Sequence, residues 1–205
     1  MSTLTATSLT SMIQADTSAE TLAAELDPLD ARARLDAVRA LPRGALPSLY
    51  ELCHGRAAGL AELVPSAIED GVPVRHFGLN SLALFRRFEK RFLRTPDGGS
   101  ELWGYNEQAM RALTGPGYFV VPAPAPGEEA GIDYRRVPPR TPDCDWPAVR
   151  TNERGLARLV YGGMVDTLRR VSEGVCIGRA HKGGEPFDAW FVLVREPLTD
   201  SSEPR

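Results

Sequence analysis

The residues best suited to acid-base chemistry near neutral pH are the three histidines, His54, His76 and His181. A neutral imidazole serves as a general base when it faces a pocket and a carboxylate orients it. His181 follows a predicted strand and Asp166 lies on the strand before it, so antiparallel pairing can bring both side chains to one face. With Tyr161, these two residues are the candidate catalytic groups. A structural role is the more frequent one for any single histidine.

Asp166 and Arg169 form a second pair of interest, because their spacing has different consequences in a helix and in a strand. Three residues apart, they share a face of a helix but lie on opposite faces of a strand. In a strand of a barrel, Asp166 can point inward with Leu168 and Arg170 on its side, as a charged interior pair or a ligand anchor. The alternative is a surface ion pair of little energetic value.

Several aromatic residues lie in or beside predicted strands. Alternation places Trp103 and Tyr105 on one strand face. If that face is the inner one, an indole N–H and a hydroxyl stand among apolar walls, as is typical of a small-molecule pocket. Packing in the hydrophobic core is the alternative explanation. Gln108 offers a further orienting hydrogen bond. The candidate ligand-binding residues are Asn80, Phe88, Trp103, Tyr105, Tyr118, Tyr161, Arg169 and Trp190.

Motifs for the common cofactors are absent from the sequence. It has no P-loop, no G-x-G-x-x-G between a strand and a helix, no H-E-x-x-H, no G-x-S-x-G and no paired C-x-x-C. Cys53, Cys144 and Cys176 have no metal-ligand spacing and are odd in number, which favours reduced thiols over a disulfide framework. We therefore expect no metal, no cofactor and a cytoplasmic location.

Size and charge set further limits. The chain has 205 residues, 42% of them hydrophobic, and a formal net charge of -3. It can bury one substantial core, and its acidic balance gives no general attraction to nucleic acid or to an anionic membrane. No signal-peptide pattern opens the sequence, and no apolar run approaches the roughly 18 residues that span a bilayer. We expect one globular domain over residues 17–196, followed by a loose C-terminus at 197–205.

The first part of the chain predicts three short helices. Residues 1–16 are rich in Ser and Thr and are expected to be a disordered tail. Thr17-Ser-Ala-Glu20 fits a capping box for the first helix, and Asp27-Pro28 fits the start of the second. The third runs from Leu46 to His54, where a glycine follows. Residues 17–54 thus form a helical lead-in.

Residues 55–196 are expected to form a β-rich barrel. Within 80–94, Leu82, Phe85 and Phe92 recur at intervals of a helix face, whereas Lys90 breaks the alternation of a strand, so we interpret this segment as a helix and keep a strand as the alternative. Seven runs of β-branched and aromatic residues predict strands. They are 102–106, 118–121, 132–137, 156–161, 165–171, 175–180 and 189–195. The fold class is therefore α+β, mainly β: an antiparallel lipocalin-like β-barrel or a strongly curved sheet preceded by short N-terminal helices.

Three short segments resemble a family of small bacterial proteins. They are Gly55-Arg-Ala-Ala-Gly59, Phe88-Glu-Lys-Arg-Phe92 and the run from Val160 to Arg169. The family is named after a Gly-x-Trp-x-Gly motif and carries a companion C-terminal domain of unknown function with lipocalin-like character. The resemblance implies a β-rich container. Ala57 stands at the Trp position and Gly162 at the position of an Asp, and the family supplies no catalytic residues to transfer.

Three functions are compatible with these observations. In the first, the barrel binds a small, largely apolar molecule that carries one polar or anionic end. In the second, the same cavity catalyses a cofactor-free isomerisation or cyclisation by confining one conformer of the substrate. In the third, the proline-rich loops or the N-terminal helices dock a protein partner. The sequence leaves the ligand and the oligomeric state open.

Overall fold

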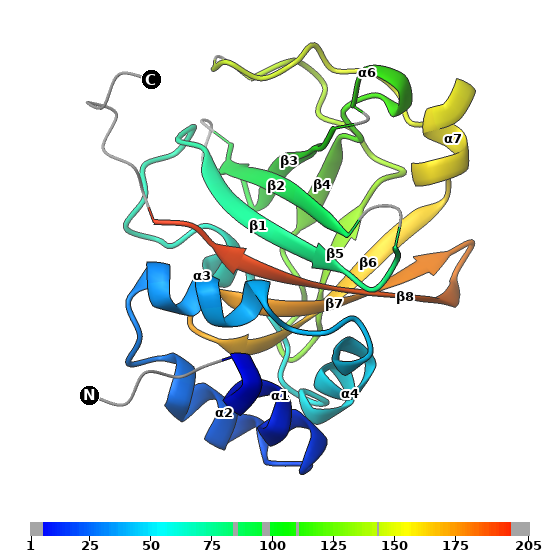
Figure 1. Ribbon diagram of the computed structural model, residues 1–205. Coiled ribbons are helices and arrows are strands. Elements are labelled where there is room, and N and C mark those ends of the chain that lie inside the picture. The colour runs from blue at the N-terminus through cyan, green and yellow to red at the C-terminus, as the bar shows by residue number, and fades with distance from the viewer. Residues whose placement is uncertain (1–5, 84–85, 96–98, 110, 143, 198–205) are drawn as a thin grey trace.

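The computed structural model describes residues 6–83, 86–95, 99–109, 111–142 and 144–197. Within these residues, eight antiparallel strands form a closed barrel in which each strand pairs with the next and β8 pairs with β1 (Figure 1). The strands are β1 (Val74–Asn80), β2 (Arg87–Arg94), β3 (Glu101–Glu107), β4 (Phe119–Pro122), β5 (Ala130–Asp133), β6 (Met164–Ser172), β7 (Val175–Lys182) and β8 (Glu185–Arg195). The expectation of a mainly β, lipocalin-like barrel is confirmed.

Seven helices accompany the barrel in the same part of the chain. They are α1 (Ala6–Gln14), α2 (Ala19–Leu26), α3 (Ala31–Arg39), α4 (Ala45–Leu52), α5 (Leu60–Leu63), α6 (Arg111–Thr114) and α7 (Gly155–Tyr161). Figure 1 shows α1 to α4 gathered on one side of the barrel beside β7 and β8, whereas α6 and α7 lie together at another edge. Among the described residues, no helix has the length and apolar character needed to cross a bilayer.

Alternation along the strands explains how one end of the barrel is filled. Inward side chains at that end are apolar and form one core cluster. They include Val74, Phe92, Leu102, Phe119, Ile132, Leu168 and Leu193. Leu63 and Val64, from α5 and the residue after it, join the same cluster and close this end of the barrel. We call it the closed end, because the opposite end contains a cavity.

The outer face of β1, β7 and β8 is also apolar, because α1 to α4 pack on it. Leu9 and Ile13 of α1 belong to one buried cluster with Phe77, Ile177 and Val192 of the barrel. Burying a large apolar side chain stabilises the fold by about 1.5–3 kcal/mol. The contact between α1 to α4 and this outer face therefore explains why both surfaces carry apolar side chains.

The disordered tail expected over residues 1–16 is wrong for residues 6–14, which form α1. Leu9 and Ile13 lie four residues apart and are at most 2% exposed. Two apolar side chains are therefore enough to hold this helix in place once the barrel offers a surface to pack against. Residues 1–5 lie outside the described residues, as does the expected loose C-terminus from residue 198 on.

Two helices begin at other residues than the sequence indicated. The Ser18 hydroxyl, not that of Thr17, accepts from the backbone N–H of Thr21 at 3.2 Å and caps α2. The Asp30 carboxylate accepts from the N–H of Ala33 at 2.8 Å and caps α3. Asp27, the expected cap of the second helix, instead accepts from a backbone N–H in the β6–β7 turn at 2.7 Å.

Two predictions of secondary structure are wrong. The segment 80–94 is not a helix, because it contains the end of β1 and the strand β2 (residues 84–85 lie outside the described residues). Lys90 interrupts the apolar alternation, yet it is buried inside the barrel. The run 156–161 is helix α7 rather than a strand. A short apolar run does not by itself distinguish a helix from a strand.

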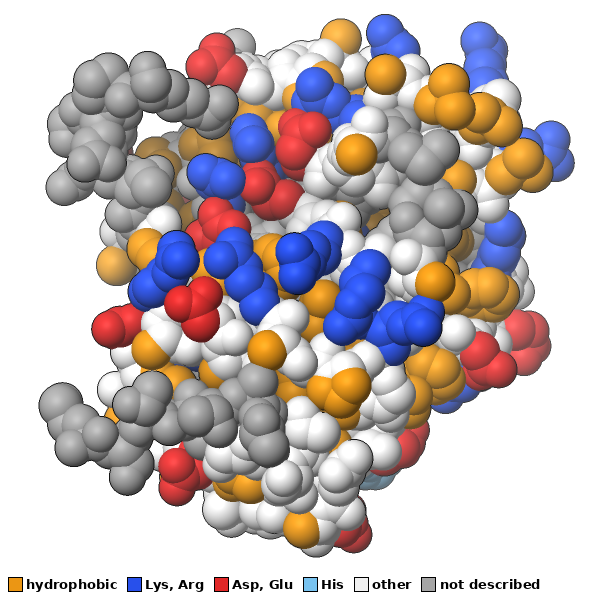
Figure 2. Space-filling model, in the orientation of Figure 1, with side chains coloured by type: hydrophobic (Ala, Val, Ile, Leu, Met, Phe, Trp, Pro, Cys, Tyr) orange, Lys and Arg blue, Asp and Glu red, His pale blue; other side chains and the backbone are white. Residues whose placement is uncertain are grey.

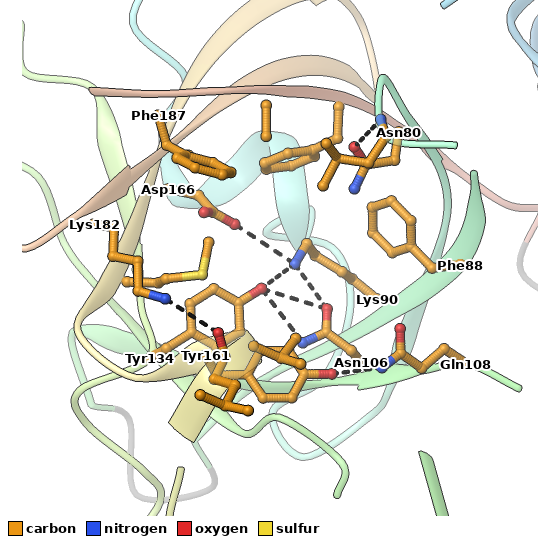
Figure 3. Close-up of a pocket in the computed structure, with 17 residues that line it drawn as sticks. Asn80, Phe88, Lys90, Asn106, Gln108, Tyr134, Tyr161, Asp166, Lys182 and Phe187 are labelled. Carbon is orange, nitrogen blue, oxygen red and sulfur yellow. Dashed lines mark hydrogen bonds and ion pairs between the residues drawn. The ribbon is translucent and has the colours of Figure 1, made fainter. Parts of the chain in front are cut away.

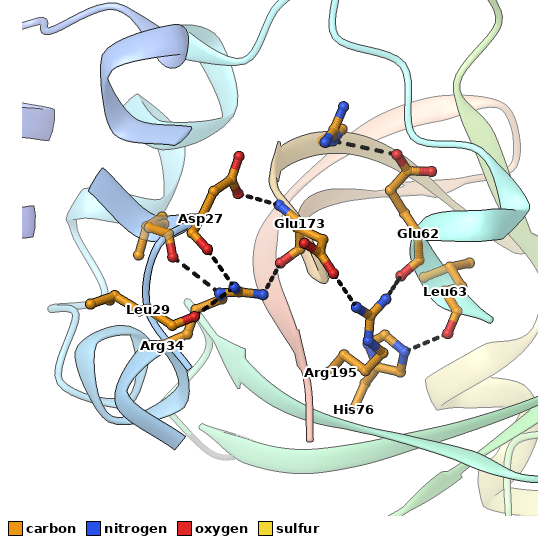
Figure 4. A network of polar contacts seen from close by, with 10 residues as sticks. Asp27, Leu29, Arg34, Glu62, Leu63, His76, Glu173 and Arg195 are labelled. Carbon is orange, nitrogen blue, oxygen red and sulfur yellow. Dashed lines mark hydrogen bonds and ion pairs between the residues drawn. The ribbon is translucent and has the colours of Figure 1, made fainter. Parts of the chain in front are cut away.

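Arg34 of α3 ties the N-terminal helices to the closed end of the barrel (Figure 4). Its guanidinium donates to the carbonyl oxygens of Leu26, Asp27 and Leu29 at 2.8–3.2 Å. A fourth bond reaches the carbonyl oxygen of Glu173, in the turn between β6 and β7. Because Arg34 is only 8% exposed, these bonds form away from competing water and fix the helical layer on the sheet.

Candidate functional site

The open end of the barrel contains a cavity of about 280 Å³. Its wall residues come from the ends of strands that meet at this rim. They include Asn80 at the end of β1, Phe88 near the start of β2, Met164 at the start of β6 and Lys182 at the end of β7. Residues 159–161, in α7, cover one side of the cavity. Antiparallel strands in sequential order therefore bring together residues that are far apart in the sequence.

Lys90 stands at the floor of this cavity (Figure 3). Its Nζ donates to Asn106 Oδ1 at 2.8 Å and to the Tyr134 hydroxyl, and it lies 3.8 Å from Asp166 Oδ2. Asn106 is fixed in turn, because its Nδ2 donates to the carbonyl oxygen of Gly117 at 3.0 Å. The four side chains come from β2, from β3, from the residue that follows β5 and from β6, and each residue is at most 5% exposed.

Aromatic rings surround the Lys90 ammonium. The ring centroids of Phe88, Phe119, Tyr134 and Phe191 all lie 5.0–5.3 Å from its Nζ. A cation at this distance from a ring is stabilised by the ring quadrupole, by up to about 2 kcal/mol when water is excluded. The rings thus hold a positive charge in a place that is otherwise poorly solvated.

Each of the three phenylalanine rings near Lys90 lies over a glycine on the neighbouring strand. The register pairs are Gly78 with Phe88, Gly104 with Phe119 and Gly178 with Phe191. A Cβ atom at any of these glycines would lie 2.2–2.4 Å from a ring atom, closer than real contacts allow. The glycines therefore let the rings pack against the barrel wall and leave space above Lys90.

Burial shifts the ionisation of the central pair. Desolvation lowers the pKa of Lys90 from its ordinary 10.5 to about 8, and the Asp166 carboxylate opposes this shift. Desolvation raises the pKa of Asp166 from 3.8 to about 6, against the effect of Lys90. Near pH 7 the two groups are an ion pair, and each lies close to exchanging its proton. Burial also raises the pKa of Tyr134 well above its ordinary value, so its hydroxyl stays protonated.

One oxygen of the Lys90–Asp166 pair, Asp166 Oδ1, is buried and accepts no hydrogen bond from the described residues. Buried carboxylate oxygens are normally satisfied, and each exception requires an explanation. Because Asp166 lines the cavity, a donor on a bound molecule can occupy this position.

The mouth of the cavity combines a polar clamp with an apolar rim. The Tyr161 hydroxyl accepts from Gln108 Nε2 at 2.7 Å, and its ring stacks on Tyr134 with centroids 5.4 Å apart. Leu159 and Phe187 line the mouth and are 70% and 47% exposed. Exposed apolar side chains beside a cavity are typical of ligand-binding sites.

The structure brings part of the sequence-predicted site to this cavity. Asn80, Phe88, Tyr161 and Asp166 all line it, and so does Gln108. Asp166 points inward from β6, as the strand interpretation required. Their role in binding stays a prediction.

Trp103, Tyr105 and Tyr118 lie elsewhere. They share one face of the sheet with each other, but it is the outer one, where Trp146 covers them and its ring centroid lies 4.9 Å from that of Tyr105. The expectation that Trp103 and Tyr105 face a pocket is therefore wrong, because alternation groups residues on a face without telling which face is inside.

Arg169 and Trp190 also point away from the cavity. Arg169 donates to the Glu129 carboxylate at 2.7 Å and to the carbonyl oxygen of Tyr50 at 2.7 Å, so it holds α4 against the outer wall of the barrel. Trp190 packs against the cluster under the N-terminal helices. Neither residue reaches the interior.

The histidines do not contribute to the cavity. Asp166 pairs with Ala180 across β6 and β7, so His181, the next residue, points to the opposite face and the expected Asp166–His181 pair does not form. His76 is buried at the closed end, with Nε2 2.8 Å from the carbonyl oxygen of Leu63. Burial lowers the pKa of His76 to about 4. His54 is exposed after α4.

Sequence reasoning missed four polar residues of the cavity: Lys90, Asn106, Tyr134 and Lys182. The chain has only two lysines, and both line this cavity. The lysine between Phe88 and Phe92 could have indicated this site. A charge at an inward position of a strand is costly unless it has partners, so it implies further polar residues inside the barrel.

Figure 2 shows a band of Lys and Arg side chains over the region of β1 and β8. Arg39, Arg75 and Arg87 line a second, open groove. Arg75 is already paired with Glu89 at 2.9 Å and with Glu196 at 3.3 Å. Ion pairs this exposed contribute little to stability, so we assign no function to this groove.

Among the described residues, no group of three or more His, Cys, Asp and Glu side chains is placed to hold a metal ion. The fold and site define a closed antiparallel barrel with a buried lysine and carboxylate beneath an apolar cavity. No family model matches this chain, and no curated protein or solved structure is significantly similar to it. The function is therefore argued from the geometry of the site.

Proposed function

We propose that this protein binds a small, largely apolar molecule with one polar end in the barrel cavity. The observation that carries the proposal is the buried Lys90–Asp166 pair beneath that cavity. A buried ion pair contributes little to stability, because the desolvation cost offsets the attraction. Recognition of a ligand explains why the cavity floor holds two charges where apolar side chains would serve stability equally well.

The cavity limits the size of the ligand. An apolar cavity of about 150 Å³ holds benzene. At about 280 Å³, this cavity accommodates a molecule of about ten to twelve non-hydrogen atoms by the same scale. Phe88, Phe187 and Phe191 contribute rings to its wall, which favours an aromatic or compact aliphatic body.

The floor of the cavity favours a polar end that both donates and accepts. The Lys90 ammonium can donate to it, and the unpartnered Asp166 Oδ1 can accept from it. A hydroxyl meets both requirements. A carboxylate meets only the first and places a second negative charge beside Asp166, so it binds more weakly near pH 7.

A titration with three matched probes tests this proposal. We expect 2-naphthalenemethanol to bind with one-to-one stoichiometry in isothermal titration calorimetry. It should bind more tightly than 2-methylnaphthalene, which lacks the hydroxyl, and than 2-naphthoate. Filling the cavity with Ala189→Trp should abolish binding while circular dichroism shows an intact fold. No saturable binding of the alcohol, or unchanged binding in the filled variant, would overturn the proposal.

A cofactor-free isomerase or cyclase is the second candidate. Burial moves the pKa values of Lys90 and Asp166 toward each other, as is common for groups that exchange protons during catalysis. This candidate requires that Asp166→Asn stops turnover of a substrate while its affinity stays nearly intact. Parallel loss of turnover and affinity would favour simple binding.

We also propose that the protein belongs to the Gly-x-Trp-x-Gly family and that it is located in the cytoplasm. Two segments that carry the resemblance adjoin, since Ala57 forms an antiparallel bridge with Arg169. The three cysteines are free thiols, which suits a reducing compartment. Cell fractionation tests the location, and a profile built from homologues tests the family.

A further inference from the structure

The use of lysine in this chain is selective. Of 24 Lys and Arg residues, only Lys90 and Lys182 are lysines, and both line the same cavity. Both residue types can supply a positive charge at the surface. Only lysine readily loses its proton in a protein and becomes a nucleophile, because arginine remains charged. A chain that uses arginine elsewhere and lysine at one cavity therefore points to a use for the amine.

The surroundings of Lys90 prepare its amine for reaction. Hydrogen bonds to Asn106 and Tyr134 hold Nζ at the cavity floor, and aromatic rings exclude water from it. A lysine desolvated in an apolar pocket is a typical nucleophile toward carbonyl groups. With a pKa of about 8, its neutral form at pH 7 is about two orders of magnitude more abundant than that of an exposed lysine.

We propose that Lys90 forms a Schiff base with the carbonyl carbon of an apolar aldehyde or ketone that enters the cavity. This inference rests on the proposed function and names a carbonyl compound as the ligand of the same site. The hydroxyl that can donate to Asp166 Oδ1 is then the one on the carbinolamine formed from that ligand. The ligand is a carbonyl compound whose apolar body fills the space beneath α7, with its carbonyl group directed to the floor.

The reaction is balanced without an oxidant or reductant. The neutral amine attacks the carbonyl carbon, a C–N bond forms, and one proton passes from nitrogen to the carbonyl oxygen to give a carbinolamine. A second proton then adds to the hydroxyl, the C–O bond breaks, water leaves, and nitrogen gives up its remaining proton in exchange. The products are an imine and one water molecule, and hydrolysis reverses the sequence.

Asp166 is placed to move the protons of this reaction. Its Oδ2 lies 3.8 Å from the amine, and its Oδ1 is free to contact the carbinolamine hydroxyl. Burial keeps the pKa of Asp166 near 6, so it can both donate and accept near neutral pH. Tyr134 and Asn106 act as positioning residues, since they hold the amine.

Lys182 provides an internal control. Its Nζ donates to the carbonyl oxygen of Leu159 at 3.1 Å at the mouth of the cavity, and the side chain is exposed. It lines the same cavity, but among the described residues its Nζ has no ion pair with a carboxylate and no cation–π contact.

Reductive trapping tests the inference on the unmodified protein. The protein is incubated at pH 7 with 2-naphthaldehyde and sodium cyanoborohydride, which converts an imine into a stable secondary amine. Peptide mapping by mass spectrometry then gives the labelling rate at each lysine. We expect Lys90 to be labelled at least tenfold faster than Lys182, at a rate that saturates with aldehyde and falls when 2-naphthalenemethanol competes. Lys90→Arg should lose this label, and Lys182→Arg should keep it.

The outcomes separate the two proposals. Labelling at Lys182 that equals or exceeds labelling at Lys90 overturns the Schiff-base inference. If the alcohol binds in the cavity while Lys90 stays unlabelled, this inference fails and the proposed function stands. If the alcohol does not bind and Lys90 is not labelled, both fail. The labelling rates of Lys90 and Lys182 are both measured in the wild-type protein. The test therefore still decides the question if the Lys90→Arg variant does not fold.

Discussion

The Lys90 ammonium and the Asp166 carboxylate face each other inside the barrel at 3.8 Å, and both residues are 3% exposed. Removing one partner leaves an uncompensated buried charge, which costs about 3–5 kcal/mol, whereas replacing both is often neutral. We therefore expect Lys90→Met and Asp166→Asn each to lower the free energy of unfolding by this amount. The double variant should lose less than either single one. Urea denaturation measures all four proteins, and additive losses would contradict the account.

The same pair predicts a dependence of stability on pH. Between pH 4 and 6, the folded protein holds a proton on Asp166 that the unfolded chain has lost, so stability falls as pH rises. Between pH 8 and 10, the unfolded chain holds a proton that folded Lys90 has lost, so stability rises with pH. Relative to the double variant, the wild-type protein should thus be least stable from pH 6 to 8.

Denaturation curves of both proteins from pH 4 to 10 measure this difference. Each group contributes a slope of at most about 1.4 kcal/mol per pH unit. The comparison removes the effects of His76 and of the buried tyrosines and cysteines, which both proteins share. A flat difference across the whole range would show that the two groups titrate at their ordinary values.

Gly178 is expected to tolerate no side chain. A Cβ at this position would lie 2.3 Å from the Phe191 ring. Gly178→Ala should cost about 1–3 kcal/mol through overpacking, and it should weaken ligand binding because the ring is displaced toward the cavity. Gly131→Ala is the matched control, since its Cβ would meet Val165 at an ordinary 3.5 Å. Thermal unfolding and calorimetric titration distinguish them, and equal behaviour would contradict the packing argument.

The rim of the cavity should contribute to affinity through apolar contact. Leu159 lines the mouth and is 70% exposed, whereas Leu113 is 64% exposed and lies outside the cavity wall. Leu159→Asp should weaken binding of 2-naphthalenemethanol about three- to tenfold, equivalent to about 1 kcal/mol of lost apolar contact. Leu113→Asp should leave the affinity unchanged. Similar losses in both variants would indicate a general effect of surface charge.

The barrel was predictable from the sequence because its strands β6, β7 and β8 follow one another with glycine-containing turns and period-two alternation. Other elements could not be predicted, because their local sequence does not determine their structure. The apolar run at 156–161 forms helix α7 beside the barrel mouth, and nothing within the run encodes that position. In α1, Leu9 and Ile13 depend on a sheet face that is assembled from distant strands.

The site was harder to predict than the fold, and Lys90 shows why. Its charge breaks the apolar pattern of β2, so the residue at the centre of the proposed site made its own strand resemble a helix. Local rules fail where a functional residue replaces a core residue. Asp166 was recovered because alternation places it inward, whereas its partners Tyr134 and Asn106 depend on pairings between strands.

The measurement that tests the central claim most directly is a crystal structure of the protein grown with 2-naphthalenemethanol at a concentration that saturates it in solution. The account expects the aromatic rings of the ligand beside Phe88 and Phe191, with its hydroxyl within hydrogen-bond distance of Lys90 Nζ and Asp166 Oδ1. A ligand bound outside the barrel, or an interior closed by the protein's own side chains, would contradict the claim that this cavity is the binding site.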